Sequence, residues 1–294
     1  MSRFVQKAKI FVPPVMRQEI RKYLDEMKVW IAYNTGVLPD FLIIGAQKCG
    51  TTSLYNYLIQ HPCIYPASVK EVGFFDRYYE KSLKWYRAQF PSAFSKYYLK
   101  FIGKQRFITG EASTGYVLNP HALERIFKIT PRAKLILLLR NPVDRAYSHY
   151  QHTLRIGMED LSFDAAIEKE DERIGDAWEK MKSDENYYNF DIALYAYLRT
   201  GTYIDQVELL FKLFAKEQIL IVKAEEFNSH PADIFRGVLD FLNMPPYERE
   251  LSVKHNAGNY PPMDPAIRQK LGNYFKPYNH ALYHFLGRNF NWDA

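Results

Sequence analysis

The chain has 294 residues, of which 47% are hydrophobic and 24% charged, and these ordinary globular proportions exclude a disordered or low-complexity protein. The net charge of +6 favours an anionic partner without identifying it. Cys49 and Cys63 are the only cysteines, which excludes a disulfide-rich scaffold and leads us to expect a reducing, cytoplasmic compartment.

Residues 1–38 are predicted to form an N-terminal helical extension. They contain no uninterrupted apolar stretch of bilayer-spanning length and no secretory signal pattern. We expect the helix to dock on the core; contact with a membrane surface or a partner is the alternative. Apolar residues recur at helical spacing after Pro13-Pro14, namely Met16, Ile20, Tyr23, Leu24, Met27, Trp30 and Ile31. Residues 39–294 are expected to form one domain.

The first predicted strand of that domain leads into a glycine-containing loop and then a helix. Phe41 to Ile44 is short, apolar and β-favouring, and a helix is expected from Thr51 to Leu58. The intervening loop has glycines at positions 45 and 50, the spacing of a phosphate-binding loop, in which backbone N–H groups surround a phosphate. A nucleotide triphosphatase would have lysine at position 51, whereas this chain has Thr51 there and Lys48 inside the loop. We therefore expect phosphate binding with a differently placed cation.

A second apolar strand, Lys134 to Leu139, is predicted after a helix that begins at Pro120. In phosphate-loop kinases such a strand ends in an acidic residue that holds Mg²⁺, but here it ends in Arg140. Arginine can clamp a phosphate with two hydrogen bonds, and Ser148 lies two turns along a helix begun by Pro142. Arg140 and Ser148 are therefore predicted to bind one monoester phosphate together.

The remaining elements complete an α/β pattern. A third apolar strand is predicted at Ile219 to Val222, and apolar strands separated by helices indicate a parallel sheet covered on both faces. The fold class expected is a three-layer P-loop-like α/β fold with a central parallel sheet. Further helices are predicted from Phe163 to near Glu170, across Ile192 to Phe214, and over residues 234–242 and 267–275.

These motifs resemble the sulfotransferases that use 3′-phosphoadenosine 5′-phosphosulfate (PAPS). Residues 41–58, 70–76 and 134–148 are similar to the family's 5′-phosphosulfate loop, catalytic segment and 3′-phosphate segment. The match is closest to the heparan sulfate 3-O- and N-sulfotransferase branch and its bacterial relatives, and it continues to the tryptophan-ending tail at residues 286–292. The resemblance implies direct in-line transfer of a sulfuryl group to a hydroxyl or amine of a carbohydrate acceptor.

The resemblance also assigns roles to individual residues. It places the general base at Glu71 and the group that stabilises the leaving phosphate at Lys48, with no metal required. His61 is a second possible base, but its place beyond the predicted loop helix favours a structural role. Acceptor contacts are expected from Lys70, Asp76 and His152. The residues implied for PAPS binding are Lys48, Cys49, Gly50, Thr51, Thr52, Ser53, Arg140, Ser148, Asn256 and Gly258.

Several positions depart from the family pattern. Relatives that act on glycosaminoglycans usually have Glu-Lys where Glu111-Ala112 stands, and the 3-O branch has arginine where Thr52 stands. Both cations serve an anionic acceptor, so their absence suggests a less anionic one. The loop at residues 255–260 also lacks the usual Lys-Gly-Arg.

Two other functions are compatible with a phosphate loop. An ATP-dependent small-molecule kinase would need a lysine at position 51 and an aspartate after Leu139, and the chain has neither. A nucleotide- or polysaccharide-binding module without turnover is the other alternative, against which Glu71 argues.

Overall fold

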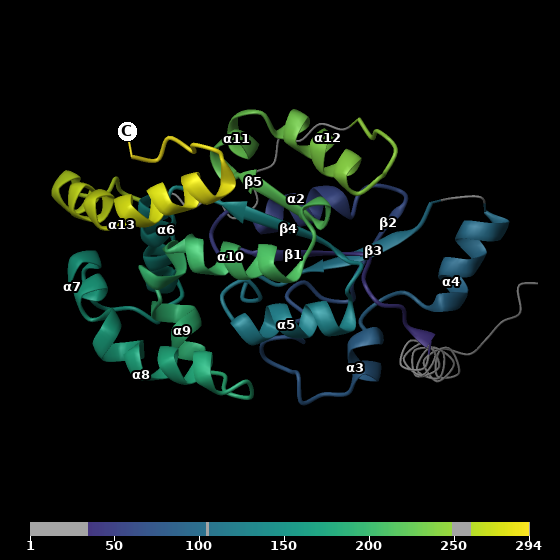
Figure 1. Cartoon of the computed structure of the whole chain (residues 1–294), viewed down its shortest axis with the longest axis horizontal. Coiled ribbons are helices and arrows are strands. Elements are labelled where there is room, and N and C mark those ends of the chain that lie inside the picture. The colour runs from purple at the N-terminus through teal and green to yellow at the C-terminus, as the bar shows by residue number, and fades with distance from the viewer. Residues whose placement is uncertain (1–34, 104–105, 249–259, 294) are drawn as a thin grey trace, which may run out of the picture.

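The computed structural model describes residues 35–103, 106–248 and 260–293 (Figure 1). A five-stranded parallel sheet forms its centre, in the order β2-β3-β1-β4-β5. The three-layer α/β prediction is confirmed. The strands are β1 (Phe41–Gly45), β2 (Ile64–Pro66), β3 (Ile108–Ala112), β4 (Lys134–Leu139) and β5 (Ile219–Lys223).

The apolar strands β1, β4 and β5 were predictable from the sequence, whereas β2 and β3 were not. β1 is completely buried, and β4 is buried except at Lys134, as expected for strands covered on both faces. β3 escaped prediction because it contains Gly110 and Glu111 instead of a continuous apolar run. Gly110 is required by packing, because a Cβ there would lie 2.5 Å from the carbonyl oxygen of Phe41 on β1. β2 has only three residues and ends in a proline.

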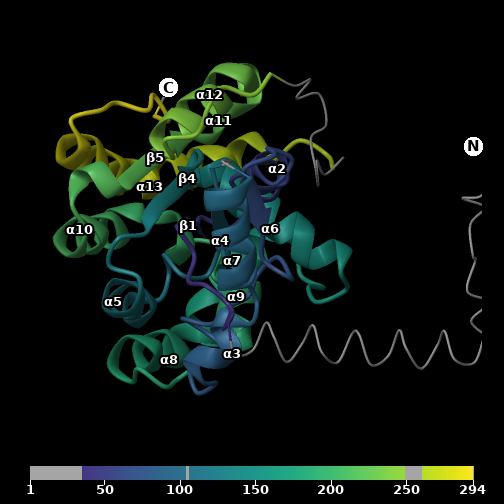
Figure 2. The same ribbon diagram turned by 90° about the vertical axis from the view of Figure 1, so that its right-hand side faces the viewer.

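Helices cover both faces of the sheet, with α5 and α10 on one side and α2 on the other (Figure 2). Most begin at a proline or a capping side chain; Asn119, for example, accepts hydrogen bonds from the first turn of α5. The helices are α2 (Thr51–Leu58), α3 (Leu83–Arg87), α4 (Ala93–Tyr97), α5 (Pro120–Ile129), α6 (Pro142–Arg155), α7 (Phe163–Glu168), α8 (Glu170–Ser183), α9 (Phe190–Tyr195), α10 (Tyr203–Leu213), α11 (Ala224–Ser229), α12 (Pro231–Phe241) and α13 (Pro265–Leu286).

The single helix predicted across Ile192 to Phe214 is wrong. The chain forms α9 and α10 with a short 3₁₀ turn, Arg199–Gly201, between them. The buried guanidinium of Arg145 donates hydrogen bonds to the carbonyl groups of Ala196 and Tyr197, which a continuous helix would use internally. A charged side chain from α6 therefore stabilises the break.

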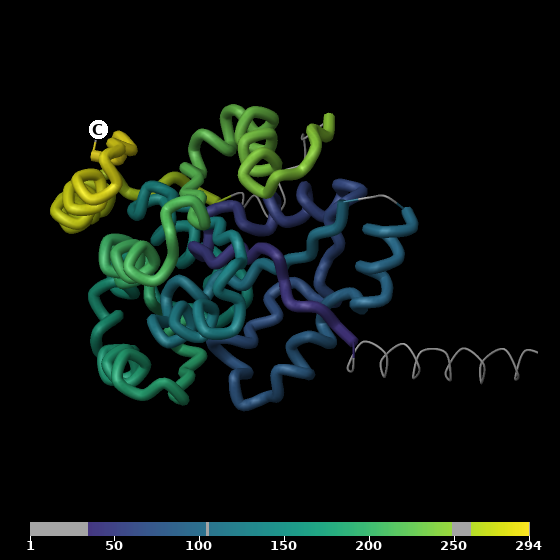
Figure 3. Tube along the Cα trace, turned by 45° about the vertical axis from the view of Figure 1, so that its right-hand side comes forward, coloured from purple at the N-terminus to yellow at the C-terminus, as the bar shows by residue number. Residues whose placement is uncertain are grey.

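The start of the described chain and the C-terminal helix α13 lie at opposite ends of the molecule (Figure 3). The helix predicted around residues 16–31 lies outside the described residues, so the division at residue 38 stays a prediction. Gly36 forms an antiparallel bridge with Ser92, and Val37 and Leu38 pack against the core. The chain is thus already attached to the body of the protein at Gly36.

Candidate active site

A pocket of about 440 Å³ lies at the carboxyl ends of β1, β3, β4 and β5. The loop after β1, Thr114 after β3, Arg140 after β4 and Ala224 after β5 all line it. The sheet order reverses around β1, which pairs with β3 on one side and β4 on the other, and such a switch point leaves a crevice for ligands. The fold therefore places the pocket where α/β proteins bind their ligands.

The loop predicted to bind phosphate forms the floor of this pocket and leads directly into α2. Gly50 is the N-cap residue of α2 and adopts a left-handed conformation with φ of 93°. Glycine supplies no side-chain cap to the helix, and the dipole at the N-terminus of a helix favours an anion. The loop geometry thus fits a phosphate group.

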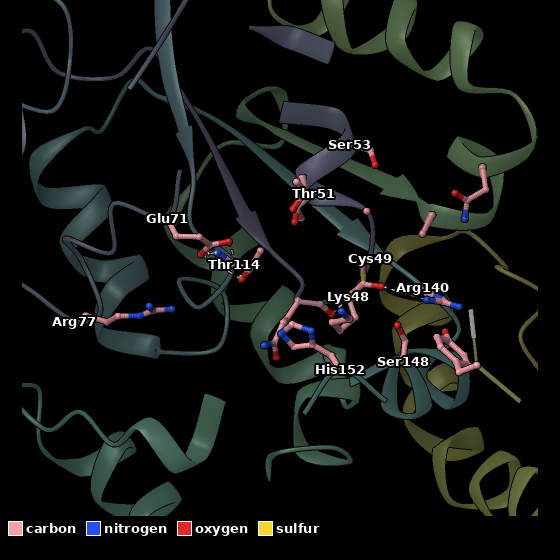
Figure 4. A pocket seen from close by; sticks show the side chains of 16 residues that line it. Lys48, Cys49, Thr51, Ser53, Glu71, Arg77, Thr114, Arg140, Ser148 and His152 are labelled. Carbon is pink, nitrogen blue, oxygen red and sulfur yellow. Dashed lines mark hydrogen bonds between the residues drawn. The ribbon is translucent and has the colours of Figure 1, made fainter. Parts of the chain in front are cut away.

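Lys48 lies in the centre of the pocket, between Glu71 on one side and Arg140 and Ser148 on the other (Figure 4). Burial, together with the positive charges of Arg155, Arg140 and Arg145, lowers its pKa to about 8. These positive charges repel one another, and a bound anion would offset the repulsion. This excess of positive charge is the electrostatic complement of a multiply charged anion such as a bisphosphate nucleotide.

Arg140 and Ser148 reach the pocket from β4 and α6, as predicted. The hydroxyl group of Tyr203 donates to the carbonyl oxygen of Arg140 at 2.9 Å, and the Arg140 guanidinium donates to the carbonyl oxygen of Lys48 at 3.3 Å. These bonds hold the strand end and the phosphate loop together. Figure 4 shows the two side chains on the same side of the pocket, an arrangement that could bind one phosphate through guanidinium and hydroxyl donors.

Glu71 lines the opposite side of the pocket in a left-handed backbone conformation, with φ of 62°. Such a conformation is costly for a residue other than glycine and is found most often where function requires it. Its carboxylate accepts hydrogen bonds from the Thr114 backbone N–H at 3.0 Å and from the Lys70 ammonium at 2.7 Å. The backbone N–H of Glu71 donates to the carbonyl oxygen of Ala112. The carboxylate is therefore oriented by β3 and the loop that follows it.

A buried polar network lies beneath the segment that carries Glu71. The fully buried Glu111 on β3 accepts hydrogen bonds from the hydroxyl groups of Tyr86, Ser113 and Tyr116, and burial raises its pKa to about 7. Ser113 in turn accepts a hydrogen bond from the backbone N–H of Gly73. The network connects the central sheet to the segment that carries Glu71, and the sequence offered no sign of it.

The pocket brings most of the predicted site residues together: Lys48, Cys49, Gly50, Thr51, Thr52, Ser53, Glu71, Arg140, Ser148 and His152. Lys70 is paired with Glu71 beside the pocket. Asp76 is buried and does not line the pocket, and burial raises the pKa of its carboxyl group to about 6. Asn256 and Gly258 lie outside the described residues.

Six lining residues were not predicted: Gln47, Arg77, Thr114, Ala224, Asn228 and Tyr260. Arg77 follows Asp76 in the chain and lies 3.9 Å from its carboxylate, on the Glu71 side of the pocket (Figure 4). The position of Thr114 just past a sheet strand was a usable signal, but that strand itself was missed. Ala224 could have been expected directly after the third predicted strand.

The two histidines considered as bases differ in position. His61 is 2% exposed; its Nδ1 accepts from the N–H of Cys63, and its Nε2 is 3.1 Å from the carbonyl oxygen of Pro245. Both ring nitrogens are therefore engaged in structural hydrogen bonds. His152 lines the pocket, but its Nδ1 accepts from Arg155, and burial together with Lys48 and Arg155 lowers its pKa.

Comparisons with known proteins identify the family. The model of the sulfotransferase domain matches residues 38–262, more than half of the chain. The chain belongs to the sulfotransferase domain family. This sulfotransferase is 30% identical to a solved sulfotransferase from Alicyclobacillus acidocaldarius, with a TM-score of 0.68 and coverage of 88% of this chain and 100% of that one. The family implies an enzyme that acts on a hydroxyl- or amine-bearing acceptor.

Two curated relatives extend the comparison. Heparan sulfate glucosamine 3-O-sulfotransferase 5 of Mus musculus is 29% identical, over 87% of this chain and 74% of its own length. A protein named membrane-associated sulfotransferase kil1, from Dictyostelium discoideum, is 28% identical over 87% of this chain and 66% of its own length. The resemblance inferred from the motifs is confirmed.

The expectation of a cytoplasmic location is wrong by the same comparison, because a relative that matches most of the chain is named for its association with a membrane. That expectation came from the presence of only two cysteines, which shows that disulfides do not hold the fold together but does not identify the compartment. In the parts of the chain that the structure describes, no helix combines the length and apolar character needed to cross a bilayer.

Proposed function

We propose that this sulfotransferase transfers a sulfuryl group from PAPS to a hydroxyl or amine group of a carbohydrate acceptor, with Glu71 as the base. The observation that carries the proposal is the arrangement of one pocket. The oriented carboxylate of Glu71 lies on one side, Arg140 and Ser148 lie on the other, and Lys48 lies between them. This arrangement fits a nucleotide with two separate phosphates.

The phosphates of PAPS would occupy the two anion sites. The N–H groups at the start of α2 and the ammonium of Lys48 would bind the 5′-phosphosulfate. Arg140 and Ser148 would bind the 3′-phosphate. Asn256 and Gly258 are retained as proposed contacts from the sequence resemblance.

The side chains then have distinct tasks in the transfer. Glu71 accepts the proton as the acceptor oxygen or nitrogen forms its bond to sulfur. The bond from sulfur to the bridging phosphate oxygen breaks, and that oxygen keeps the electron pair. Lys48 stabilises the negative charge that develops there. The products are the sulfated acceptor and adenosine 3′,5′-bisphosphate.

The acceptor would approach from the Glu71 side, where His152 lines the pocket and Lys70 lies beside it. Asp76 is buried, so we propose that it acts on the acceptor through Arg77, whose Nε lies 3.9 Å from its carboxylate. The relative named for heparan sulfate supports a carbohydrate acceptor. Position 52 is threonine and position 112 is alanine, which supports one less anionic than heparan sulfate.

Calorimetric titration tests the nucleotide assignment before any acceptor is known. Adenosine 3′,5′-bisphosphate should bind, and Mg·ATP should bind far more weakly because the pocket offers no aspartate after β4. Tighter binding of Mg·ATP would favour a kinase. Binding of the bisphosphate without transfer from labelled PAPS to any of a panel of sugars would favour a binding module.

Replacing Arg140 tests the 3′-phosphate site. Arg140→Ala should weaken adenosine 3′,5′-bisphosphate binding by about 2–4 kcal/mol, because a charged phosphate loses its paired donor. Binding of adenosine 5′-phosphate should hardly change. Arg132→Ala, at the opposite end of β4, is the matched control. Equal losses for both nucleotides would show that Arg140 does not bind the 3′-phosphate.

The lowered pKa of Lys48 predicts a pH dependence of nucleotide binding. In the free enzyme Lys48 loses its proton near pH 8, whereas a bound anion favours the charged form and raises the pKa. Binding therefore takes up a proton above pH 8, and affinity for adenosine 3′,5′-bisphosphate should fall about tenfold per pH unit there. Lys48→Arg should flatten the profile between pH 8 and 9.5. An unchanged slope in that variant would assign the proton to another group.

The acceptor assignment predicts a weak response to salt. A weakly anionic acceptor bound by polar and aromatic groups should have a KM that changes little between low and physiological ionic strength. Initial rates at saturating PAPS measure this. A steep increase in KM would instead indicate a strongly anionic polymer.

A further inference from the structure

Helix α4 and the π-helical turn that continues it, Tyr98–Ile102, expose apolar side chains that globular proteins usually bury. Phe94 is 72% exposed, Phe101 61% and Ile102 62%. Tyr97 and Tyr98 are exposed as well, and the rings of Tyr97 and Phe101 lie 5.0 Å apart. These five residues, Phe94, Tyr97, Tyr98, Phe101 and Ile102, are called the α4 face.

The α4 face belongs to an amphipathic helix whose apolar side points outward. Positions 94, 97, 98 and 101 have the spacing of one helical stripe. Lys96, between them, points back to the body of the protein, where its ammonium lies 3.0 Å from the carboxylate of Asp40. Ser92 caps the helix and is half-buried. Helix α4 therefore packs its polar side against the protein and leaves its aromatic side in water.

The positive charge of the chain is concentrated in the same segment. Residues 81–110 contain seven lysines and arginines and no aspartate or glutamate, whereas the rest of the chain has a net charge of −1. Lys81, Lys84 and Lys100 are exposed, and Lys81 lies over the rings of Tyr78 and Trp85. The excess of cations that the whole sequence shows is therefore a local property of this end of the molecule.

Helix α3 and the start of the described chain lie at this same end (Figures 1 and 2). Leu83 on α3 is 41% exposed. The bridge between Gly36 and Ser92 and the hydrogen bond from Arg87 to the carbonyl oxygen of Gly36 fix the chain beside the first residue of α4. Residues 1–34, whose sequence predicts an amphipathic helix, therefore join the body next to the α4 face.

We propose that the α4 face docks this enzyme onto the surface of an anionic lipid bilayer. Phenylalanine and isoleucine gain by leaving water for the acyl boundary, tyrosine suits the headgroup region, and lysines interact with anionic headgroups. A sulfated polysaccharide would satisfy the lysines but would leave Phe94, Phe101 and Ile102 in water. A second copy of this chain would bring the exposed Lys81, Lys84 and Lys100 against the same lysines of its partner. The bilayer fits both the apolar and the charged components.

This inference is independent of the proposed reaction, since none of the α4 face residues lines the pocket. The relative named as membrane-associated is compatible with it.

Vesicle co-sedimentation of the full chain tests the proposal. Vesicles of phosphatidylcholine alone are compared with vesicles containing about a third phosphatidylserine. The protein should partition to the anionic vesicles, and the double variant Phe94→Ser/Phe101→Ser should lose at least about tenfold in partition coefficient. Lys84→Gln/Lys100→Gln should lose about fivefold per lysine, and only on anionic vesicles. Phe190→Ser and Lys212→Gln/Lys216→Gln, exposed on other helices, are the matched controls and should bind like the unmodified chain.

Melting temperatures confirm that each variant is folded, which is expected because the replaced side chains are exposed. Failure of the full chain to bind anionic vesicles would overturn the proposal. So would binding that survives Phe94→Ser/Phe101→Ser but is lost in Trp30→Ser/Ile31→Ser, because the N-terminal segment alone would then be the contact. A dimer in sedimentation velocity that the phenylalanine variant abolishes, or capture on sulfated polysaccharide that depends on the lysines alone, would each assign the face to a different partner.

Discussion

Glu71→Gln should reduce kcat by about 10²–10⁴-fold while leaving affinity for adenosine 3′,5′-bisphosphate nearly unchanged. The amide keeps the size of the side chain and can still accept the Thr114 N–H hydrogen bond, but it cannot take a proton. The carboxylate lies on the opposite side of the pocket from Arg140 and Ser148, so its replacement should not disturb nucleotide binding (Figure 4). Single-turnover transfer, with binding measured separately, resolves the two effects.

Glu80→Gln is the matched control, because Glu80 is exposed nearby in the same segment of the chain. It should retain wild-type turnover. If Glu71→Gln retains more than about a tenth of wild-type turnover, the base lies elsewhere and His152 is the next candidate to replace.

Lys48→Ala should lower both nucleotide affinity and kcat, with the greater loss in kcat. The ammonium meets the phosphosulfate in the ground state, and its interaction strengthens as charge develops on the bridging oxygen. Its half-buried position among Arg140, Arg145 and Arg155 makes it part of the site's positive field, so binding falls as well. Rates and bisphosphate affinities for the same preparation give the ratio of the two losses.

Lys48→Arg is the informative companion, because it keeps the charge but changes the position of the donors. It should recover most of the affinity and only part of the rate. A Lys48→Ala variant that loses affinity alone, with kcat unchanged, would limit Lys48 to ground-state binding.

The fold was predictable where sequence pattern and burial coincide. β1, β4 and β5 are apolar runs, and each of the three was found within a residue of its observed bounds. β3 was missed because its buried interior includes Glu111, whose partners Tyr86 and Tyr116 come from distant parts of the chain. A pattern of hydrophobic residues cannot reveal a polar group that is buried only because other segments supply its hydrogen bonds.

Some residues of the candidate site were predictable from local sequence, and others were not. Residues 48–53 are contiguous and span the end of the loop after β1 and the first turn of α2, so local sequence was enough to predict them as part of the site. Arg77 reaches the pocket from a turn and Asn228 reaches it from α11, and the positions of both segments are set by packing that a single sequence does not show. The orientation of Glu71 by Thr114 likewise depends on the register between two distant segments.

Single-turnover transfer from PAPS labelled in its sulfuryl group tests the central claim most directly. Enzyme in excess is mixed with labelled PAPS and a panel of carbohydrate acceptors, and both the label and adenosine 3′,5′-bisphosphate are followed. The account predicts that wild-type enzyme moves the label onto a sugar hydroxyl or amine in step with bisphosphate formation, and that Glu71→Gln binds PAPS equally well but transfers at least a hundredfold more slowly. Transfer by Glu71→Gln at the wild-type rate, or tight binding of PAPS with no transfer by the wild-type enzyme to any acceptor, would contradict it.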